Sequence, residues 1–391
     1  MKIHFKYINY WVLLSTDEIR NKSIRRKFSK ALYDVFNDFD NLDNNSSNTS
    51  LFKDLDQEYR LKFTFTDNIH RNHFNDYSSG IIASDYKEQN LKSKTVSIIN
   101  NSLFYKDGEV EFALDISNPY SVLVKIFDSN NIKKSLRIFH KGFKNHLESQ
   151  ASLFYYRIFL MFTQLWNVNH DYSYIHAASF EINNRSVLCS ADSGVGKSSL
   201  LFALSRKKEY KFISDDLSVV NRDGSSSFLG RPLSLKPYHL NHFPFLKPIV
   251  RNSMPFMQRL QWGILQDKRL IYRMSYKKIF ENKSTNSDIK LCLHFCNHDK
   301  SSFDVRDITT EEFISLASTI INNEFFLLFR KLDNIASVPS SRIPSSLDIL
   351  EKTKNLYQDT FSNIPKKIIL IPYKSNPNNL FDFLKSIECL D

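Results

Sequence analysis

Residues that can hold a phosphate group occur together in one short segment of the chain. Residues 186–200 read SVLCSADSGVGKSSL, an apolar strand-like run followed by a glycine-rich turn and a helix-like run. Gly194 and Gly196 allow the backbone to curl so that successive N–H groups point at phosphate oxygens. Lys197 then has the spacing to reach the β- and γ-phosphates, and the Ser198 hydroxyl has the spacing to ligate magnesium. The segment predicts a P-loop that binds a nucleoside triphosphate with magnesium.

The expected phosphate-binding residues form one continuous run along the chain. They are Asp192, Ser193, Gly194, Val195, Gly196, Lys197, Ser198 and Ser199. The P-loop consensus has glycine where this chain has Ala191, so we expect the backbone there to keep a negative φ. The alternative is a chance strand–turn–helix with a basic cap. The chain has only eight glycines, two of them within three residues here, and this favours the P-loop.

Two adjacent carboxylates follow the next strand-like run. Asp215 and Asp216 lie in the segment FISDDLSVV, eighteen residues beyond Lys197. One carboxylate of such a pair can hold magnesium, and the other can accept the proton of an attacking hydroxyl. An Asp-Asp pair is also common in turns, but its place beside a P-loop favours a functional role.

Three further polar residues flank these motifs. His176 in YIHAASF precedes the P-loop strand, although a single histidine is more often structural. Arg231 and Lys236 in LGRPLSLKP follow the Asp pair. A cation there can neutralise a transferring phosphoryl group. A solvated turn explains the same two residues equally well.

A pattern that suggests zinc fails a geometric test. Cys292, His294, Cys296 and His298 alternate along LCLHFCNH. On a strand, residues two apart are about 6.6–7 Å apart, whereas zinc needs every ligand about 2.0–2.3 Å away. We therefore interpret this run as a strand and expect no zinc site.

The order of strand and helix patterns predicts two domains. The N-terminal part has short strand patterns, at Leu61–Phe65, Thr95–Ile99, Val110–Leu114 and Ser121–Phe127, and a polar loop at Asn41–Ser50. The C-terminal part alternates strand patterns with helix patterns. The expected strands are Ser186–Cys189, Tyr210–Ile213, Leu217–Val220, Ile289–Phe295 and Lys367–Ile371. The expected helices are Lys197–Ser205, one capped by Thr309 and Glu312, and Asn378–Ile387. We expect a β-rich (α+β) N-terminal domain over residues 1–150 and an α/β domain over residues 151–391.

The composition is that of a globular cytoplasmic protein. The chain has 391 residues, 42% hydrophobic and 24% charged, with a formal net charge of +11. The basic run Arg20–Lys30 has helical periodicity and no accompanying nucleic-acid module, so we expect no nucleic-acid partner. The apolar run Ala151–Trp166 is shorter than a membrane span and carries Arg157, which favours a buried helix. Four scattered cysteines exclude a disulfide framework, and a homo-oligomer is left open.

The motifs taken in order resemble a known family. His176, the run ADSGVGKS at residues 191–198 and the Asp215-Asp216 pair look like the catalytic domain of bacterial HPr kinase/phosphorylase. They are closer still to HPr-kinase-related proteins found beside peptide natural-product clusters, including the lasso-peptide kinases. That group has an Arg-Pro-Leu-x-Leu-Lys stretch like Arg231–Lys236 here. The resemblance extends over about Asp171–Asp391.

The resemblance implies a P-loop kinase fold related to phosphoenolpyruvate carboxykinase, acting with ATP and Mg²⁺ on a Ser or Thr hydroxyl of a protein or peptide. By position, Lys197 and Ser198 would hold phosphate and magnesium. Asp215 would be the general base and Asp216 a magnesium partner, with the reverse order left open. His176 would orient the pair. From the residues themselves, Arg231 is the candidate cation at the transferring group.

The chain departs from the HPr kinases in one respect that bears on its substrate. Three functions remain open. The second signature of HPr kinases is absent from the chain, so neither HPr as the substrate nor the phosphorylase reaction is expected. The first function is a kinase of a protein or biosynthetic precursor peptide. The second is a kinase of a small-molecule hydroxyl, and the third is a nucleotide-gated binding protein without transfer. The base preference between ATP and GTP is not encoded in any motif.

Overall fold

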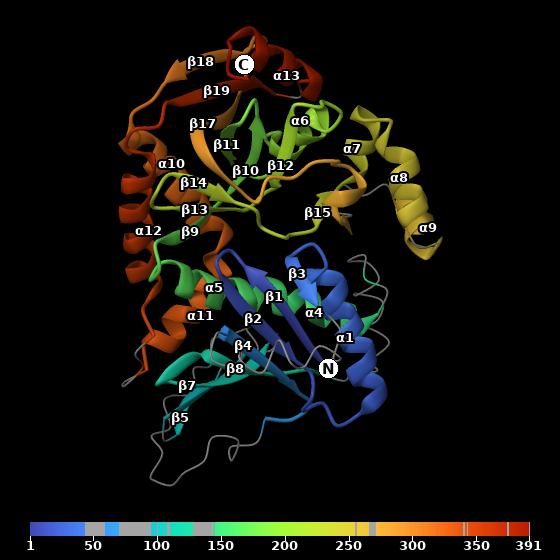
Figure 1. Ribbon diagram of the computed structural model, residues 1–391, viewed down its shortest axis with the longest axis vertical. Helices are drawn as coiled ribbons and strands as arrows, with labels where there is room; N and C mark the ends of the chain where they lie inside the picture. The colour runs from blue at the N-terminus through green and yellow to red at the C-terminus, as the bar shows by residue number, and fades with distance from the viewer. Residues whose placement is uncertain are drawn as a thin grey trace. The chain divides into compact units, whose positions relative to one another are not determined.

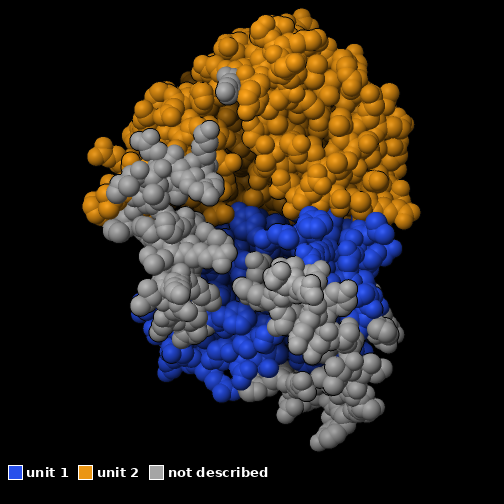
Figure 2. Space-filling view, turned by 180° about the vertical axis from the view of Figure 1, so that it is seen from behind, with its two compact units in different colours: residues 1–139, 143–166, 325–349 blue, residues 140–142, 167–324, 350–391 orange. Residues whose placement is uncertain are grey.

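The computed structural model describes residues 1–43, 59–69, 95–99, 101–107, 110–127, 143, 145–254, 256–265, 271–338, 341, 343–373 and 375–390. The chain forms two compact units, coloured separately in Figure 2. Unit 1 comprises residues 1–139, 143–166 and 325–349, and unit 2 comprises residues 140–142, 167–324 and 350–391. Both units combine strands with helices, so the architecture is mixed α/β. The domain boundary expected at residue 150 stays a prediction.

Unit 1 contains an eight-stranded sheet. Its order is β3 (Asp40–Asp43), β1 (Lys2–Tyr7), β2 (Tyr10–Ser15), β4 (Tyr59–Thr66), β8 (Asn118–Lys125), β7 (Glu111–Asp115), β6 (Ser102–Lys106) and β5 (Thr95–Ile99). Strands β2, β4 and β8 are parallel, and the other neighbours are antiparallel. Strand β3 extends into the segment predicted as a polar loop, which corrects that prediction for residues 41–43. Residues 44–50 of the same prediction lie outside the described chain.

An aromatic cluster forms the core of unit 1. The described helices of this unit are α1 (Lys22–Phe36), α4 (His146–Phe154), the π-helical turn η3 (Tyr155–Phe159), α5 (Leu160–Asn167) and α11 (Phe326–Ala336). Seven aromatic rings lie within 6.2 Å of the Phe159 ring, those of Phe5, Tyr7, Phe36, Phe39, Phe63, Phe154 and Tyr155. The predicted helices at Arg20–Lys30 and Ala151–Trp166 are both present, the second one interrupted by the π turn.

A buried ion pair fastens α11 within unit 1. The Lys331 ammonium donates a hydrogen bond to the Asp107 carboxylate, and both side chains are buried. The Tyr105 hydroxyl donates to the same carboxylate at 3.1 Å. Burial, together with the charge of Asp107, raises the pKa of Tyr105, so its hydroxyl keeps its proton.

Unit 2 is built on a nine-stranded sheet. Along its main path the order is β12 (Tyr210–Ser214), β10 (Ala177–Ile182), β11 (Arg185–Ala191), β17 (Asn286–His298), β14 (Ser225–Ser227), β13 (Ser218–Asn221) and β9 (Tyr172–Ile175). Strand β19 (Lys366–Pro372) pairs in parallel with β17 and antiparallel with β18 (Asp304–Asp307). Strand β11 is also parallel to β17.

Helices cover both faces of this sheet (Figure 1). One face carries α6 (Lys197–Leu204), α7 (Pro237–His242), α8 (Leu246–Ser253) and α13 (Pro377–Ser386). The other carries α10 (Thr310–Glu324) and α12 (Ser346–Phe361). Along β11, Cys189 packs toward α6 and Leu188 toward α10. Burial on both faces explains why this strand reads as a continuous apolar run.

The other described elements of unit 2 are α9 (Phe256–Leu265), the 3-10 helix η4 (Tyr276–Lys278) and a two-stranded ribbon of β15 (Leu233–Leu235) and β16 (Tyr272–Met274). The predicted cap of α10 is confirmed, because the Glu312 carboxylate accepts from the Thr309 N–H at 2.9 Å and the Glu312 N–H donates to the Thr309 hydroxyl at 3.2 Å. Among the described residues, no single helix is long and apolar enough to cross a membrane. One bent pair of consecutive helices, α10 with α11, meets that length and composition only together.

Candidate active site

The sheet of unit 2 brings three chain segments to one edge. Strand β10 is antiparallel to both β11 and β12, with Ala177 opposite Ser190 and Ser179 opposite Ser214. The start of β10 therefore lies beside the ends of β11 and β12. His176 directly precedes β10, the glycine-rich turn directly follows β11, and the Asp pair directly follows β12. His176 and Asp216, 40 positions apart in the sequence, meet at this edge.

Both glycines of the glycine-rich turn have a positive φ. Gly194 has a φ of 88° and Gly196 a φ of 120°, values that side-chain-bearing residues rarely adopt. Gly196 is the N-cap residue of α6, so the free N–H groups of the first helical turn lie next to the loop. Ala191 is the last residue of β11 and has no positive φ, as expected. Its methyl group is therefore accommodated without backbone strain.

Lys197 is held against its own loop. Its Nζ donates to the Ala191 carbonyl at 2.7 Å and to the Asp192 carbonyl at 3.0 Å, and the residue is 4% exposed. Burial lowers the pKa of Lys197, against the opposing effect of the carboxylates of Asp216 and Asp215. An ammonium has three N–H groups. Two are used by carbonyls, which leaves one for a phosphate oxygen.

Asp215 is buried and bonded to the loop helix. The Ser198 Oγ donates to the Asp215 Oδ1 at 2.8 Å, and Asp215 is 6% exposed. Burial, followed by the charge of Asp216, raises the pKa of Asp215 to about 6, although the Ser198 hydrogen bond acts in the opposite direction. A carboxylate with this proton affinity is ionised at neutral pH and is close enough to its pKa to exchange a proton.

Asp216 is held by two donors. The His176 Nε2 lies 2.8 Å from its Oδ1, and the Arg231 Nη1 lies 3.0 Å from its Oδ2. Partial burial alone would raise the pKa of Asp216, but Arg231 and His176 outweigh it and hold the pKa far below the usual value. The carboxylate is therefore ionised, so the proton of the hydrogen bond belongs to His176. Because the Asp216 side chain is 34% exposed, it can also reach a ligand.

The backbone turns sharply between the two carboxylates. Asp216 has a φ of 68°, and the Leu217 N–H donates to the Asp215 carbonyl at 2.7 Å. A hydrogen bond between residues two apart around a positive φ is the pattern of a γ-turn, which is strained for a residue other than glycine. The turn sends the two side chains to different partners. Asp215 thus reaches Ser198, and Asp216 reaches His176 and Arg231.

Most of the predicted site residues meet at this edge of the sheet. Two of them, Ser199 and Lys236, are placed otherwise than predicted. Ser199 is buried within α6, so only its backbone can take part in a phosphate site. Lys236 precedes α7, where its N–H donates to the His239 Nδ1 at 3.1 Å. Arg231 is the cation of this stretch that contacts the Asp pair.

Glu324 belongs to the site and was not predicted. Its Oε1 accepts from the Ser193 hydroxyl at 3.1 Å and lies 3.9 Å from the His176 Nε2. Glu324 is the last residue of α10, and 131 positions separate it from Ser193. No motif marks such a residue, because its position depends on how α10 packs on the sheet.

His294 also lies near the loop, on the strand considered above for zinc. It pairs in register with Ser190 on β11, and burial lowers its pKa to about 4, so the imidazole is neutral at pH 7. Within the described part of the chain, no three His, Cys, Asp or Glu side chains are grouped so that they hold a metal ion by themselves. A magnesium ion bound with a triphosphate needs fewer protein ligands, because phosphates and water supply the others. Ser198 and the Asp pair fit that requirement.

Comparison with known proteins adds one structural similarity. No protein-family model matches the chain, and no curated protein matches its sequence. Among solved structures, the chain is similar to the HPr(Ser) kinase/phosphatase from Coxiella burnetii, with 11% sequence identity and a TM-score of 0.26. The match covers 56% of this chain and 97% of the other. A TM-score of 0.26 does not establish a shared fold, so this structural similarity carries no argument about function.

Proposed function

We propose that this chain is a phosphotransferase that moves the γ-phosphoryl group of ATP to a Ser or Thr hydroxyl of a protein or peptide. One observation carries the proposal. A glycine-rich loop with a buried lysine and a pair of carboxylates with opposite pKa shifts lie at the same edge of one sheet. Pairs of titratable groups with separated proton affinities are typical of acid–base sites.

The loop residues would bind the triphosphate. The backbone N–H groups around Gly194 and Gly196, together with the start of α6, would surround phosphate oxygens. Lys197 would donate its remaining N–H to the same group. Ser198 and Asp216 would hold Mg²⁺, which neutralises negative charge on the phosphates when bound. Ser193 and Asp192, both exposed in the loop, complete the rim of the site.

Asp215 would act as the general base. The acceptor oxygen forms a bond to the γ-phosphorus while the bond from that phosphorus to the β–γ bridging oxygen breaks. The acceptor proton passes to the Asp215 carboxylate, and ADP leaves with the bridging oxygen. The pKa of about 6 supports this role, because a base is most effective when its pKa is near the working pH.

Arg231 and His176 would fix the charge of Asp216. Both contact its carboxylate directly and keep it ionised across the neutral range. An ionised, partly exposed carboxylate suits a magnesium partner better than a base, because it has little tendency to take a proton. This supports Asp215 as the base and Asp216 as the metal partner, rather than the reverse. The order of motifs, which resembles that of HPr-kinase-related proteins, supports a polypeptide acceptor.

The test is transfer of labelled γ-phosphate from ATP with Mg²⁺ in two acceptor mixtures. One mixture holds Ser- and Thr-containing peptides encoded near the gene, and the other holds pooled metabolites. We expect label on a peptide from the wild-type chain and none from a Lys197→Ala variant. Label on a metabolite would replace the peptide acceptor by a small molecule. Nucleotide binding with no labelled product in either mixture would contradict the transferase proposal and favour a nucleotide-gated binding protein.

A further inference from the structure

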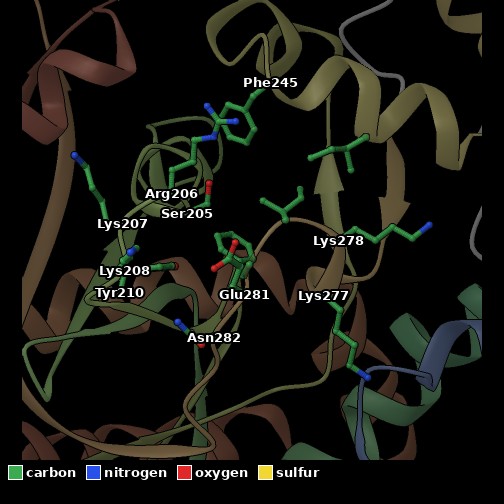
Figure 3. A pocket seen from close by; sticks show the side chains of 13 residues that line it. Ser205, Arg206, Lys207, Lys208, Tyr210, Phe245, Lys277, Lys278, Glu281 and Asn282 are labelled. Carbon is green, nitrogen blue, oxygen red and sulfur yellow. The ribbon is translucent and has the colours of Figure 1, made fainter.

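A concave feature of unit 2 lies away from the phosphate loop. A cavity of about 500 Å³ opens where α6 ends and β12 begins, and Figure 3 shows the side chains that line it. Five of these side chains are basic and exposed, those of Arg206, Lys207, Lys208, Lys277 and Lys278. They come from two chain segments about 70 residues apart. Their gathering around one cavity is therefore produced by the fold.

The cavity carries an excess of positive charge. Glu281 is the acidic residue among the side chains that line it. Within the described parts of the chain, no ion pair joins any of the five cations to an acid. Like charges that share a concave surface repel one another, and the surface attracts anions from solution. A ligand with several negative charges would relieve this repulsion.

The arrangement of the cations favours an extended ligand over a compact one. In Figure 3 the amino ends of Lys207, Lys277 and Lys278 point to different sides of the cavity, and none converges on its centre. Glu281 and Asn282 occupy the central part of the view. A single phosphate group at the centre would meet the Glu281 carboxylate. A chain that carries carboxylates at intervals would instead meet one cation at a time.

Two further contacts suit a polypeptide. The Arg206 guanidinium lies 4.6 Å from the centre of the Phe245 ring, which holds its planar fork in place for a carboxylate. Phe245, Ile249 and Phe280 also line the cavity and offer apolar surface to aliphatic side chains. The central Glu281 carboxylate can accept backbone N–H groups, which a peptide has and a polyphosphate lacks.

The cavity lies at a defined distance from the phosphate loop. Strand β12 begins at Tyr210, which lines the cavity, and Asp215 directly follows its last residue. Five steps of about 3.3 Å put these two residues roughly 16 Å apart. Helix α6 runs from the loop to the residue before the cavity-lining Ser205. An extended peptide spans such a distance with about five residues.

We propose that this cavity docks an acidic segment of the polypeptide substrate, at least five residues away from the phosphorylated Ser or Thr. This inference rests on the proposed kinase function for the identity of the ligand. The docking itself needs neither nucleotide nor transfer. Acidic residues near the acceptor would thus select the substrate through a surface separate from the reacting groups.

Direct binding tests the proposal. The probe is fluorescein-labelled hexaglutamate, and its fluorescence anisotropy is measured with the full chain in the absence of nucleotide. Lys277→Glu/Lys278→Glu reverses two charges of the cavity. Lys300→Glu/Lys354→Glu is the matched control, since both lysines are exposed in unit 2 and neither lines the cavity. We expect at least a tenfold loss of affinity in the cavity variant and less than a twofold loss in the control.

Several outcomes would overturn the inference. Equal losses in the two variants would show that the probe responds to net charge alone, and absence of binding to the wild-type chain would remove the site. Labelled tripolyphosphate or a thymidine oligonucleotide that binds more tightly than hexaglutamate, with the same dependence on Lys277 and Lys278, would assign the cavity to another ligand class. Because no nucleotide is present, failure of the kinase proposal leaves this readout unchanged, and the two proposals are tested separately.

Discussion

Two buried lysines, Lys331 in unit 1 and Lys197 in unit 2, have opposite kinds of partner. In unit 1, Lys331 contacts the Asp107 carboxylate directly. In unit 2, Lys197 donates to two backbone carbonyls, and no ion pair within the described residues joins it to a carboxylate. Its pKa nevertheless responds to four carboxylates nearby, those of Asp216, Asp215, Glu324 and Asp192. The charge of Lys331 is balanced by its direct partner, whereas Lys197 lies near four carboxylates, of which those of Asp215, Asp216 and Glu324 bond to other groups.

The difference separates a structural charge from an available one. A buried ion pair is satisfied internally and has no capacity for a ligand. A lysine held by carbonyls keeps its full positive charge and one free N–H. Burial makes that charge costly to maintain, as the lowered pKa of Lys197 indicates. A phosphate group would stabilise it, and this is the physical basis for assigning the loop to a triphosphate.

The largest expected effect is the loss of stability when Lys331, the lysine paired with Asp107, is replaced. Lys331→Met leaves the Asp107 carboxylate buried without its cation, and we expect a loss of about 3–5 kcal/mol in the free energy of unfolding. Urea unfolding followed by circular dichroism measures this loss. The double variant Lys331→Met/Asp107→Asn removes both charges and should recover most of it. A single variant within about 1 kcal/mol of wild type would show that the pair does not stabilise unit 1.

The buried carboxylate of the site should affect stability in a pH-dependent way. The pKa of Asp215 is about 6 in the folded chain against an ordinary value of 3.8, so between these values the folded chain binds more protons than the unfolded one. Stability from this group is present below about pH 4 and is lost as the pH rises through about 6. The loss is on the order of 3 kcal/mol. Asp215→Asn lacks this titration, so its unfolding free energy relative to wild type should rise between pH 4 and pH 7. A constant difference would refute the shifted pKa.

Replacing Lys197 should weaken nucleotide binding more than it lowers the free energy of unfolding. Lys197→Met is expected to weaken binding of a non-hydrolysable ATP analogue about 100-fold, through loss of a charge-assisted hydrogen bond. The same variant should lose less than about 2 kcal/mol in unfolding free energy, because it removes a buried charge together with its hydrogen bonds. Calorimetric titration and urea unfolding check both values. A stability loss as large as that of Lys331→Met would abolish the contrast between the two lysines.

The smallest expected effect concerns Glu324. Its carboxylate bonds Ser193 at the mouth of the loop and repels a triphosphate. Glu324→Gln keeps a hydrogen-bond acceptor and removes the charge, so we expect three- to tenfold tighter nucleotide binding, about 1 kcal/mol. Ser193→Ala is the control, since it removes the hydrogen bond and leaves the carboxylate. Weaker binding in Glu324→Gln would indicate instead that Glu324 helps to hold the metal.

The sequence was informative where chemistry and local geometry coincide. The strand, turn and helix around residues 186–205 were predicted because glycine, lysine and serine follow a spacing imposed by phosphate itself. The cap of α10 was predicted from Thr309 and Glu312, whose side chains bond within one turn. The long apolar helix of unit 1 was also predicted, but not its π turn, for which no residue pattern exists.

The remaining features depend on contacts between distant segments. The position of Glu324 follows from the packing of α10, and the partners of Asp216, Arg231 and His176, come from segments on either side of it in the sequence. The sequence of two adjacent aspartates does not predict that their pKa values shift in opposite directions. They arise because one carboxylate is buried against Ser198 and the other faces two donors.

The most direct test of the central claim compares transfer with binding in one variant. Asp215→Asn is expected to lower γ-phosphoryl transfer from ATP to the acceptor about 1,000-fold, the usual contribution of a general base. Its affinity for the ATP analogue should stay within about threefold of wild type, since Lys197 and the loop are intact. This separation of transfer from binding is what the proposed phosphotransferase mechanism predicts. Transfer retained in Asp215→Asn, or a wild-type chain that binds no nucleotide, would contradict it.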